Sequence, residues 1–341
     1  MGITDVHSHL YFPDWYPQRF QKQLAIDYLR RRGEHIAEEL VGRKLNALNR
    51  VLSDRDGSIC LRVMDKVGIE KRALHVIDWG LELGEPVCTV WDINEAVLRI
   101  CRRHQDRLIG FAGVDPRRSD AVSLVAWAFD KLGAAGLKLH PTSRGWTLDD
   151  ERVAALVDLA AQRKLPVMVH TGGTVSVLCD EHCQPSALLR LSARFAGVDF
   201  IAAHSGFSNW RAFGLDPPPN LWFDISAWQE RLSIDGEGLK AEIQQLLARF
   251  PNRVFFGTDS PFYGFNMAFS EAKWIAVVRE CAERVGPETV RSVFSGTIVA
   301  PVRGTRSDTG PLRQRNAVRN NEGRNEDREV LKRPESNGSE R

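Results

Sequence analysis

The sequence predicts an α/β fold, a single (β/α)8 TIM barrel with a helical insertion and a polar C-terminal tail. Three observations predict it: eight short apolar runs recur along the chain, amphipathic segments separate them, and the chain has 341 residues. Such a barrel commonly uses about 250 residues or more as one domain. A doubly wound open sheet is the alternative, but it normally carries a glycine-rich phosphate loop after its first strand, where this sequence reads His-Ser-His.

The apolar runs are short and rich in β-branched residues, as parallel strands buried on both faces should be. Between them lie segments such as 149–164, in which Val153, Leu156, Val157 and Ala160 repeat at steps of three and four residues. This spacing is typical of amphipathic helices, and strands that alternate with helices pair in parallel through right-handed crossovers. The predicted strands cover residues 3–9, 73–78, 109–115, 136–140, 166–170, 199–204, 221–225 and 253–259.

The connection between the first two strands is much longer than usual. It runs from about residue 13 to about residue 68, whereas connections between a strand and a helix commonly have about two to six residues. Leu45, Leu48 and Leu52 have helical spacing, so the segment is predicted to fold into helices. Two interpretations stay open: a lid over the barrel mouth, or a packed structural appendage.

The end of the chain differs in composition from the rest. No aromatic residue follows Phe294, and polar and charged residues dominate the last part of the sequence. The predicted organisation is a barrel domain over residues 1–302 and a disordered tail over residues 303–341. Pro301 is expected to halt a helix near its position, so the last helix of the barrel is expected to be shortened or replaced.

The composition indicates a protein that acts on a small molecule. Apolar residues make up 43% of the chain and charged residues 26%, which is ordinary for a globular protein, and the formal net charge is only +2. No basic stripe with interleaved aromatic residues is present, so neither nucleic acid nor a membrane surface is an expected partner. The N-terminus lacks the basic and apolar regions that direct secretion, so a cytoplasmic location is expected. A homodimer stays open.

Polar residues end several of the predicted strands. His7 and His9 are two residues apart on the first strand, so their side chains project from the same face. His170, His204 and Asp259 end the fifth, sixth and eighth strands, at the end of the barrel where barrel enzymes place their sites. Burying these groups without partners would cost several kcal/mol each, whereas a bound dication would coordinate them. The pattern therefore predicts a metal site.

Six short motifs occur in a fixed order along residues 3 to about 296. They are Asp5-Val6-His7-Ser8-His9, Gly110-Phe111-Ala112-Gly113-Val114-Asp115-Pro116, Gly136-Leu137-Lys138-Leu139-His140-Pro141, Val169-His170-Thr171-Gly172, Ala203-His204-Ser205-Gly206 and Gly257-Thr258-Asp259-Ser260-Pro261. In these motifs the sequence resembles the amidohydrolase superfamily, and within it the amidohydrolase-related (amidohydrolase 2) branch. This branch includes metal-dependent TIM-barrel hydrolases and enzymes similar to aminocarboxymuconate-semialdehyde decarboxylase.

The resemblance implies a mononuclear site for one divalent metal ion, usually zinc, with manganese as the alternative. The implied ligands are His7, His9, His170 and Asp259. In such proteins the histidine of the sixth strand usually lies beside the metal-bound water or the substrate, so His204 is expected to be an acid/base or orienting residue. A dication with an open coordination position lowers the pKa of bound water from about 15.7 towards about 7. Asp259 and His204 would then move the proton.

Four further residues are expected to bind the substrate. Lys138 and His140 share one face of the fourth strand, and the resemblance implies that they line the pocket, where they can contact an anionic substrate. For Lys138, a carboxylated bridge between two metals and a buried structural role beside Asp115 are alternatives. Trp79 and Trp146 follow strand ends closely, so they are expected at the pocket rim, with packing between loops as the alternative.

Three functions stay open at this point. The first is a metal-dependent hydrolase that uses a metal-activated water on a small ester, lactone or amide. The second is a metal-dependent, non-oxidative decarboxylase of an aromatic or muconate-like acid, which the tryptophans and the cationic lining favour. The third is a catalytically inactive metal-binding protein whose atypical C-terminus leaves the barrel unstable. Release of carbon dioxide separates the first two, and turnover of any substrate excludes the third.

Overall fold

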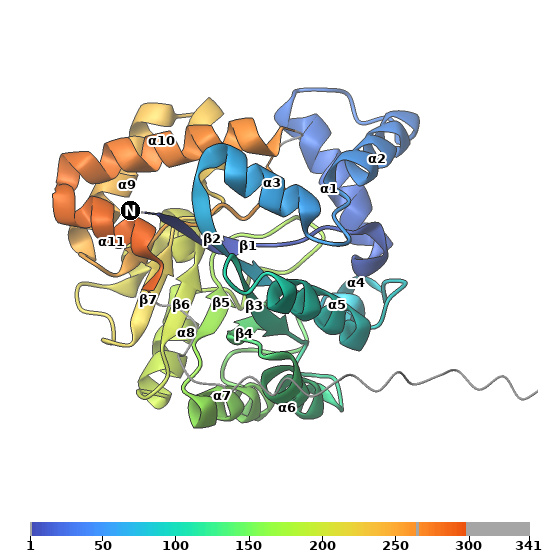
Figure 1. Ribbon diagram of the computed structural model, residues 1–341, viewed down its shortest axis with the longest axis horizontal. Helices are drawn as coiled ribbons and strands as arrows, with labels where there is room; N and C mark the ends of the chain where they lie inside the picture. The colour runs from blue at the N-terminus through green and yellow to red at the C-terminus, as the bar shows by residue number, and fades with distance from the viewer. Residues whose placement is uncertain (1, 264–265, 298–341) are drawn as a thin grey trace, which may run out of the picture. The chain divides into compact units, whose positions relative to one another are not determined.

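The computed structural model describes residues 2–263 and 266–297, which form a parallel eight-stranded barrel surrounded by helices (Figure 1). The strands pair in the order of the sequence, which confirms the predicted (β/α)8 fold. The predicted tail, residues 303–341, and Pro301 lie outside the described residues. The strands are β1 (Ile3–Ser8), β2 (Ile69–His75), β3 (Leu108–Gly113), β4 (Gly136–Leu139), β5 (Val167–His170), β6 (Phe200–Ala203), β7 (Leu221–Asp224) and β8 (Val254–Phe255).

Two strands have boundaries that differ from the prediction. β2 begins earlier, at Ile69, because this residue pairs with Ile3 at the start of β1. β8 is only two residues long, because the next amide, Phe256 N, donates to Val293 O in the last helix (2.8 Å). The sequence shows the apolar run of β8 but not the point at which its backbone leaves the sheet.

The barrel closes between β1 and the segment that follows β8. His9 N donates to Ser260 O (2.7 Å), and the amides of Thr258 and Asp259 both donate to His7 O (3.2 and 2.8 Å). These bonds join the first and last strands of the barrel. They also place Asp259 beside His7 of β1 and His9, which directly follows it.

An outer layer of helices covers the sheet. The last of them, α11, packs against both β1 and β8 and ends at Gly296, whose left-handed backbone (φ 56°) is typical of a helix end. Helix α11 thus closes the described barrel, and its last helical residue, Ser295, lies before the position of Pro301. The outer helices are α3 (Ser58–Val67), α5 (Val90–Arg103), α6 (Ala121–Leu132), α7 (Glu151–Arg163), α8 (Pro185–Arg194), α9 (Gly236–Arg249), α10 (Met267–Val285) and α11 (Pro287–Ser295).

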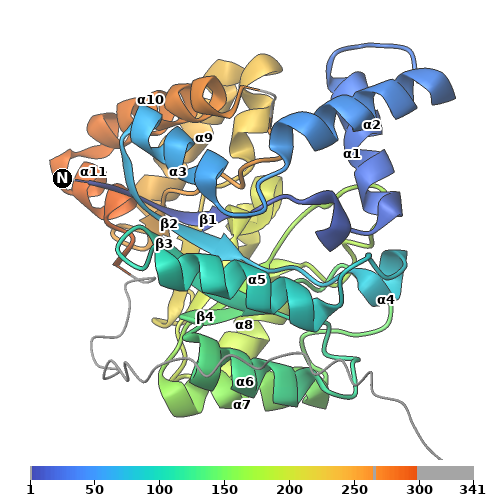
Figure 2. The ribbon, with the colours of Figure 1, turned by 45° about the vertical axis from the view of Figure 1, so that its right-hand side comes forward.

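The long connection after β1 is helical, as predicted. It contains the short helix η1 (Pro13–Trp15), then α1 (Gln18–Arg31) and α2 (Glu38–Leu52), before α3 begins. Helices α1 and α2 pack against each other and project from the barrel in both views (Figures 1 and 2). Shorter helices follow three other strands: α4 (Gly80–Leu83), η2 (His204–Phe213) and η3 (Trp228–Ser233).

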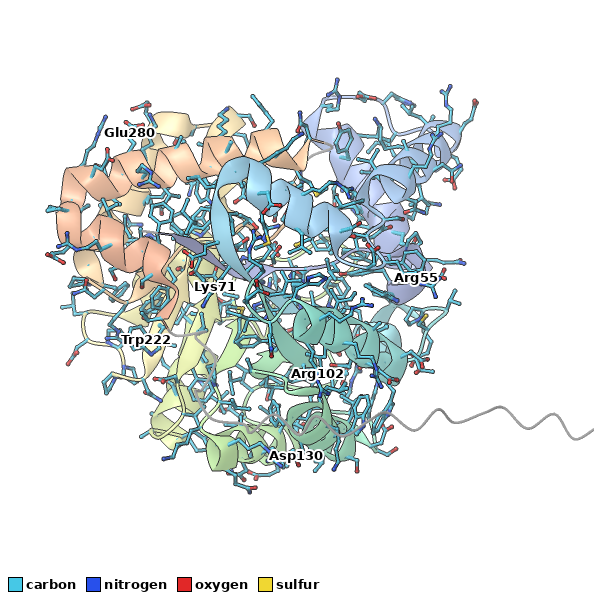
Figure 3. All side chains as sticks on the ribbon, in the orientation of Figure 1. Arg55, Lys71, Arg102, Asp130, Trp222 and Glu280 are labelled. Atoms are coloured by element: carbon cyan, nitrogen blue, oxygen red, sulfur yellow. The ribbon has the colours of Figure 1, made fainter. Side chains whose placement is uncertain are left out.

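The hydrophobic core has two parts. The larger part lies between the sheet and the outer helices, and the smaller part comes from strand residues alone and fills the barrel interior. Charged side chains such as Arg55, Arg102, Asp130 and Glu280 lie at the periphery (Figure 3). No helix among the described residues is long and apolar enough to cross a membrane. The interior core is built from Val6, Ala73, Ile109, Phe111, Met168, Ile201, Ala203 and Phe255.

Candidate functional site

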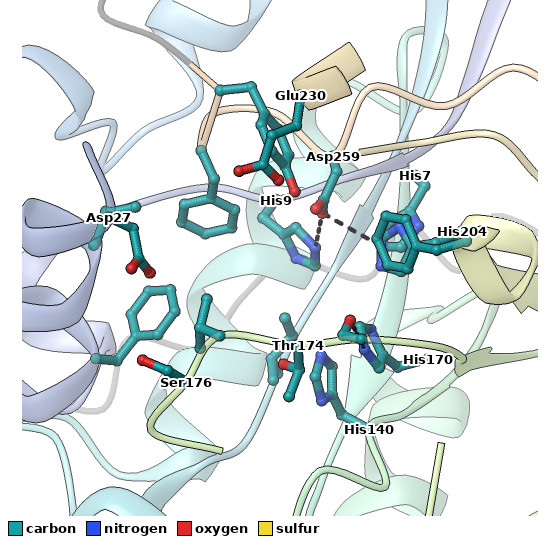
Figure 4. Close-up of a pocket in the computed structure, with 18 of the residues that line it drawn as sticks. His7, His9, Asp27, His140, His170, Thr174, Ser176, His204, Glu230 and Asp259 are labelled. Carbon is teal, nitrogen blue, oxygen red and sulfur yellow. Dashed lines mark hydrogen bonds and ion pairs between the residues drawn. The ribbon is translucent and has the colours of Figure 1, made fainter. Parts of the chain in front are cut away.

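The strand-end residues singled out in the sequence line one pocket of about 510 Å³ (Figure 4). His7 comes from β1, His9 directly follows β1, His170 ends β5, His204 begins η2, and Asp259 lies in the segment after β8. The pocket thus opens at the C-terminal ends of the strands, where barrel enzymes have their sites. Its volume suits a small organic molecule.

Three of the expected ligands form a compact group. The ligand atoms of His7, His9 and Asp259 all lie within 4.8 Å of one another. Asp259 Oδ1 is 3.1 Å from His9 Nε2 and 3.7 Å from His7 Nε2, as the dashed lines in Figure 4 show. His9 Nδ1 is 2.8 Å from the carbonyl oxygen of His75 and must donate to it, so the lone pair of a neutral His9 is on Nε2, the atom that faces Asp259.

A second carboxylate, Asp224, supports His7 from behind. Its Oδ2 lies 2.9 Å from His7 Nδ1, and its Oδ1 accepts from the amides of His204 (3.1 Å) and Ser226 (2.8 Å). A carboxylate bonded to the far nitrogen of a histidine fixes the ring orientation and makes the near nitrogen a better metal ligand. Sequence analysis missed Asp224, although an acidic residue at the end of the apolar seventh run was a signal.

His170 has the ring orientation of a ligand but stands apart from the compact group. Its Nε2 lies 3.2 Å from the carbonyl oxygen of Gly173 and donates to it, which leaves the lone pair on Nδ1. That Nδ1 is buried and has no hydrogen-bond partner among the described residues. A buried acceptor without a partner is unfavourable by itself, and a metal ion at this atom would relieve it.

His204 faces the pocket from the sixth strand end. Its Nδ1 lies 3.1 Å from the carbonyl oxygen of Ser226, and its backbone is left-handed (φ 60°), a strained conformation that often occurs at functional sites. The ring stacks on His7 and Phe207, with centroids 4.8 Å apart in both pairs. His204, His7 and Asp224 form a second group of possible ligands, but Asp224 already bonds to His7 Nδ1. The first group is therefore the better metal site.

Burial keeps these imidazoles neutral. Burial lowers the pKa of His7, His140 and His204 well below the usual value. It also lowers the pKa of His170 to about 3, and the positive charge of the nearby Lys138 lowers that pKa further. Neutral imidazole is the form that binds metal. The histidines therefore need no deprotonation at neutral pH before they coordinate an ion.

Lys138 lies beneath the site and is not among the described residues that line the pocket. Its Nζ is 3.2 Å from His7 Nε2, and burial lowers its pKa to about 8. Asp115, the expected partner of Lys138 in a buried structural role, forms an ion pair with Arg117 instead (2.7 Å). The structure thus places Lys138 against the metal group and gives it no contact with the pocket.

Of the other three residues expected to bind the substrate, two line the pocket and one is absent from the described residues that line it. His140 and Trp79 both line it, and Trp79 Nε1 donates to His140 Nδ1 at 3.3 Å. His140 also stacks on His170, with ring centroids 4.1 Å apart. Trp146 is buried, and it is absent from the described residues that line the pocket, which agrees with the alternative of packing between loops.

Helix α1 of the insertion forms one wall of the pocket, a role that the spacing of the sequence did not resolve. It contributes Phe20, Asp27 and Arg31, among others. Arg31 Nε pairs with Glu230 of η3 at 2.6 Å, so the insertion is tied to the loop after β7. This geometry agrees with the lid interpretation for α1. The aromatic part of the wall consists of Phe20, Trp79, Phe207, Phe262 and Tyr263.

Comparison with known proteins agrees with this arrangement. The sequence profile of the family described as Amidohydrolase matches residues 83–300, which include His170, His204 and Asp259 but not β1. No curated protein sequence matches the chain.

Solved structures of low sequence identity share the fold. One is 5-carboxyvanillate decarboxylase from Sphingomonas paucimobilis (14% identity, TM-score 0.58, 86% of this chain and 99% of that chain covered). Another is the same enzyme from Novosphingobium aromaticivorans, complexed with manganese and 4-hydroxy-3-methoxy-5-nitrobenzoic acid (15%, 0.56, 86% and 93%). A third is a probable 2-pyrone-4,6-dicarboxylic acid hydrolase from Acinetobacter baumannii (13%, 0.50, 86% and 100%).

Proposed function

The chain belongs to the amidohydrolase family and is an enzyme of the amidohydrolase type, and from this premise we propose that it hydrolyses a small ester, lactone or amide with the help of one divalent metal ion. The proposed ligands are His7, His9, His170 and Asp259. The observation that carries the proposal is the Asp259 carboxylate beside pocket histidines, of which His9 Nε2 and His170 Nδ1 keep their lone pairs. Four ligands of this kind suit zinc or manganese.

A divalent ion held there would polarise the scissile carbonyl group and make water more acidic. Asp259 would accept a proton from the attacking water, because its carboxylate borders the pocket and lies beside His7 and His9. Asp259 would then hand this proton to the leaving group. His204 would orient the attacking water by accepting a hydrogen bond from it, since its Nδ1 donates to Ser226 O and the other ring nitrogen keeps the lone pair. Asp224 orients His7.

Decarboxylation of a small aromatic acid is the second candidate. The observation that favours it is the wall of aromatic side chains around the metal group, on which a flat ring can stack. Two of the solved structures with this fold are decarboxylases of 5-carboxyvanillate, and one of them is described with manganese. In this reaction Asp259 would first take a proton from a hydroxyl group of the substrate or from water, and would then deliver it to the ring carbon that loses carbon dioxide.

One experiment separates the two reactions. Purified protein loaded with zinc or manganese is incubated with matched lactones, esters, amides and hydroxybenzoic acids, while acid release, carbon dioxide release and incorporation of ¹⁸O from labelled water are followed. Hydrolysis incorporates ¹⁸O into the product acid and releases no carbon dioxide. Decarboxylation releases carbon dioxide without ¹⁸O incorporation into the remaining product.

The metal content of the same preparation tests the site. One equivalent per chain is expected, because one group of ligands converges on the pocket. Two equivalents would favour a carboxylated Lys138 that bridges two ions. Protein that takes up neither zinc nor manganese would refute the proposed site, and turnover by metal-free protein would refute the proposed role of the ion.

A further inference from the structure

Asp259 is held in a backbone conformation that needs support from its surroundings. Its φ is 52°, in the left-handed region that residues other than glycine rarely adopt. Such conformations persist where neighbouring contacts over-determine them. Its two neighbours in the chain, Thr258 and Ser260, are buried. The hydroxyl group of each donates a hydrogen bond to a member of one buried group of charged residues.

This group, which we call the seam triad, consists of Asp5, Arg72 and Glu271. Arg72 Nε lies 2.9 Å from Asp5 Oδ2, and Arg72 NH2 lies 2.5 Å from Glu271 Oε2. The three side chains are at most 4% exposed. Asp5 comes from β1, Arg72 from β2 and Glu271 from α10. The triad lies behind the pocket wall, because none of its members is among the described residues that line the pocket.

The seam triad holds the Asp259 segment from both sides. Asp5 Oδ2 accepts from Thr258 Oγ1 at 2.6 Å, and Asp5 Oδ1 accepts from the amides of Thr258 (3.0 Å) and His7 (3.1 Å). Glu271 Oε1 accepts from Ser260 Oγ at 2.6 Å. The Asp5 carboxylate thus contacts both β1 and the segment after β8, and the Glu271 carboxylate fixes Ser260, the residue after Asp259.

We propose that the seam triad, acting through the hydroxyl groups of Thr258 and Ser260, positions the Asp259 carboxylate for metal binding. The inference rests on the proposed function, in which Asp259 is a ligand. Asp5, Arg72 and Glu271 are positioning residues: they contact neither the pocket nor the expected position of the ion. Their contribution is to keep the Asp259 backbone in its left-handed conformation before the ion arrives.

The alternative is that the triad only joins α10 to the barrel and that the two hydroxyl bonds are incidental. The two interpretations differ in what they predict for the hydroxyl groups. A purely structural triad would be weakened by loss of these bonds, with a lower melting temperature and an unchanged metal affinity. A positioning triad requires them for affinity, because the hydroxyl groups connect it to the residues on either side of Asp259.

The test is the double variant Thr258→Val/Ser260→Ala, which removes both hydroxyl groups and keeps all three triad members. The dissociation constant for Mn²⁺ is measured on metal-free protein by the electron paramagnetic resonance signal of free Mn²⁺, with the melting temperature of the metal-free protein beside it. The expected result is an affinity about 10- to 100-fold weaker than that of the wild type, the range seen when residues that orient metal ligands are lost.

Two control variants separate positioning from stability. Val157→Ala truncates a fully buried side chain of α7, and it is expected to lower the melting temperature while the Mn²⁺ dissociation constant stays within about twofold of the wild type. Thr258→Ser keeps a hydroxyl group at the same position and is expected to retain the wild-type affinity. If the double variant does not fold, Ser260→Ala alone replaces it, with an expected loss of affinity of about threefold or more.

The outcomes distinguish failure of this inference from failure of the proposed function. If wild-type protein binds Mn²⁺ and Asp259→Asn loses it, but the double variant keeps wild-type affinity, the triad is structural and the metal site stands. An equal loss of affinity in Val157→Ala would also overturn the inference, because general destabilisation would then explain the effect. If wild-type protein binds no Mn²⁺, the proposed site and the inference fall together.

Discussion

The two halves of the site differ in how completely the protein itself assembles them. On the side where β1 meets β8, which we call the seam half, His7, His9 and Asp259 already lie within 4.8 Å of one another. On the opposite side, His170 belongs to neither group of described residues with that spacing, and its Nδ1 has no partner. In the proposed site the seam half is therefore assembled without an ion, whereas an ion would have to complete the opposite half.

The cause of this difference lies in the contacts behind each half. Backbone bonds between the barrel ends, the carboxylate of Asp224 and the seam triad all fix the seam half. The opposite half is a row of neighbouring imidazoles: His140 stacks on His170 with ring centroids 4.1 Å apart, and His170 meets His204 edge to face at 4.8 Å. We therefore propose that the two halves have separate tasks: the seam half would retain the metal, and the opposite half would handle substrate and protons.

The largest expected effect comes from damage to the seam half. Asp259→Asn removes the only carboxylate of the compact group, and with it a negative charge that offsets the charge of the ion. Both the metal content and kcat are expected to fall to background. Elemental analysis and a turnover assay on the same preparation check this, and a variant with full metal content would show that Asp259 is not a ligand.

The next largest loss of kcat is expected from a substitution in the opposite half, and it should leave the metal content nearly unchanged. His204→Asn is expected to reduce kcat by about two to four powers of ten, the range for positioned acid/base groups, while most of the metal stays bound. Metal stoichiometry measured beside kcat separates it from Asp259→Asn. Equal metal loss in the two variants would make His204 a ligand, and the division between the halves would then be wrong.

The sequence allowed prediction of the strands and of the residues that end them. Period-two spacing places His7 and His9 together, and the order of the strands brings His170, His204 and Asp259 to the same end of the barrel. These inferences need only local pattern and barrel topology.

The contacts that hold the ligands could not be predicted in the same way. The bonds from Asp5 to Thr258 and from Arg72 to Glu271 join residues that are 253 and 199 positions apart, and nothing in the spacing of the sequence pairs them. For Trp146, the position close after a strand end predicts a place at the pocket rim. The side chain is instead buried and is absent from the described residues that line the pocket, because that position does not determine which way the side chain points. Local pattern locates a residue on an element, and tertiary packing decides its partner.

A smaller effect is expected from Asp224, which supports the seam half without belonging to the proposed ligands. Asp224→Asn keeps the shape of the side chain but removes the charge behind His7 Nδ1, so the near nitrogen becomes a weaker ligand. The metal dissociation constant is expected to rise about 10- to 100-fold, and titration with Mn²⁺ measures it. An unchanged dissociation constant would restrict Asp224 to a role in packing.

The smallest effect concerns the rim of the opposite half. Trp79 Nε1 donates to His140 Nδ1 at 3.3 Å, and Thr142 Oγ1 lies 2.8 Å from the same ring nitrogen. Trp79→Phe removes the donor and keeps an aromatic ring in the pocket wall. Because one such hydrogen bond contributes about 0.5–1.5 kcal/mol, kcat/KM is expected to fall about twofold to twelvefold.

The metal content of Trp79→Phe should equal that of the wild type, because neither Trp79 nor His140 belongs to the compact group. His140→Gln is the matched variant: in the double variant, the two losses in kcat/KM should be less than additive if Trp79 acts through His140. Additive losses would mean that Trp79 contacts the substrate by itself. A loss of metal on substitution of Trp79 would show that the imidazoles of the opposite half also retain the ion, against the separation of tasks between the two halves.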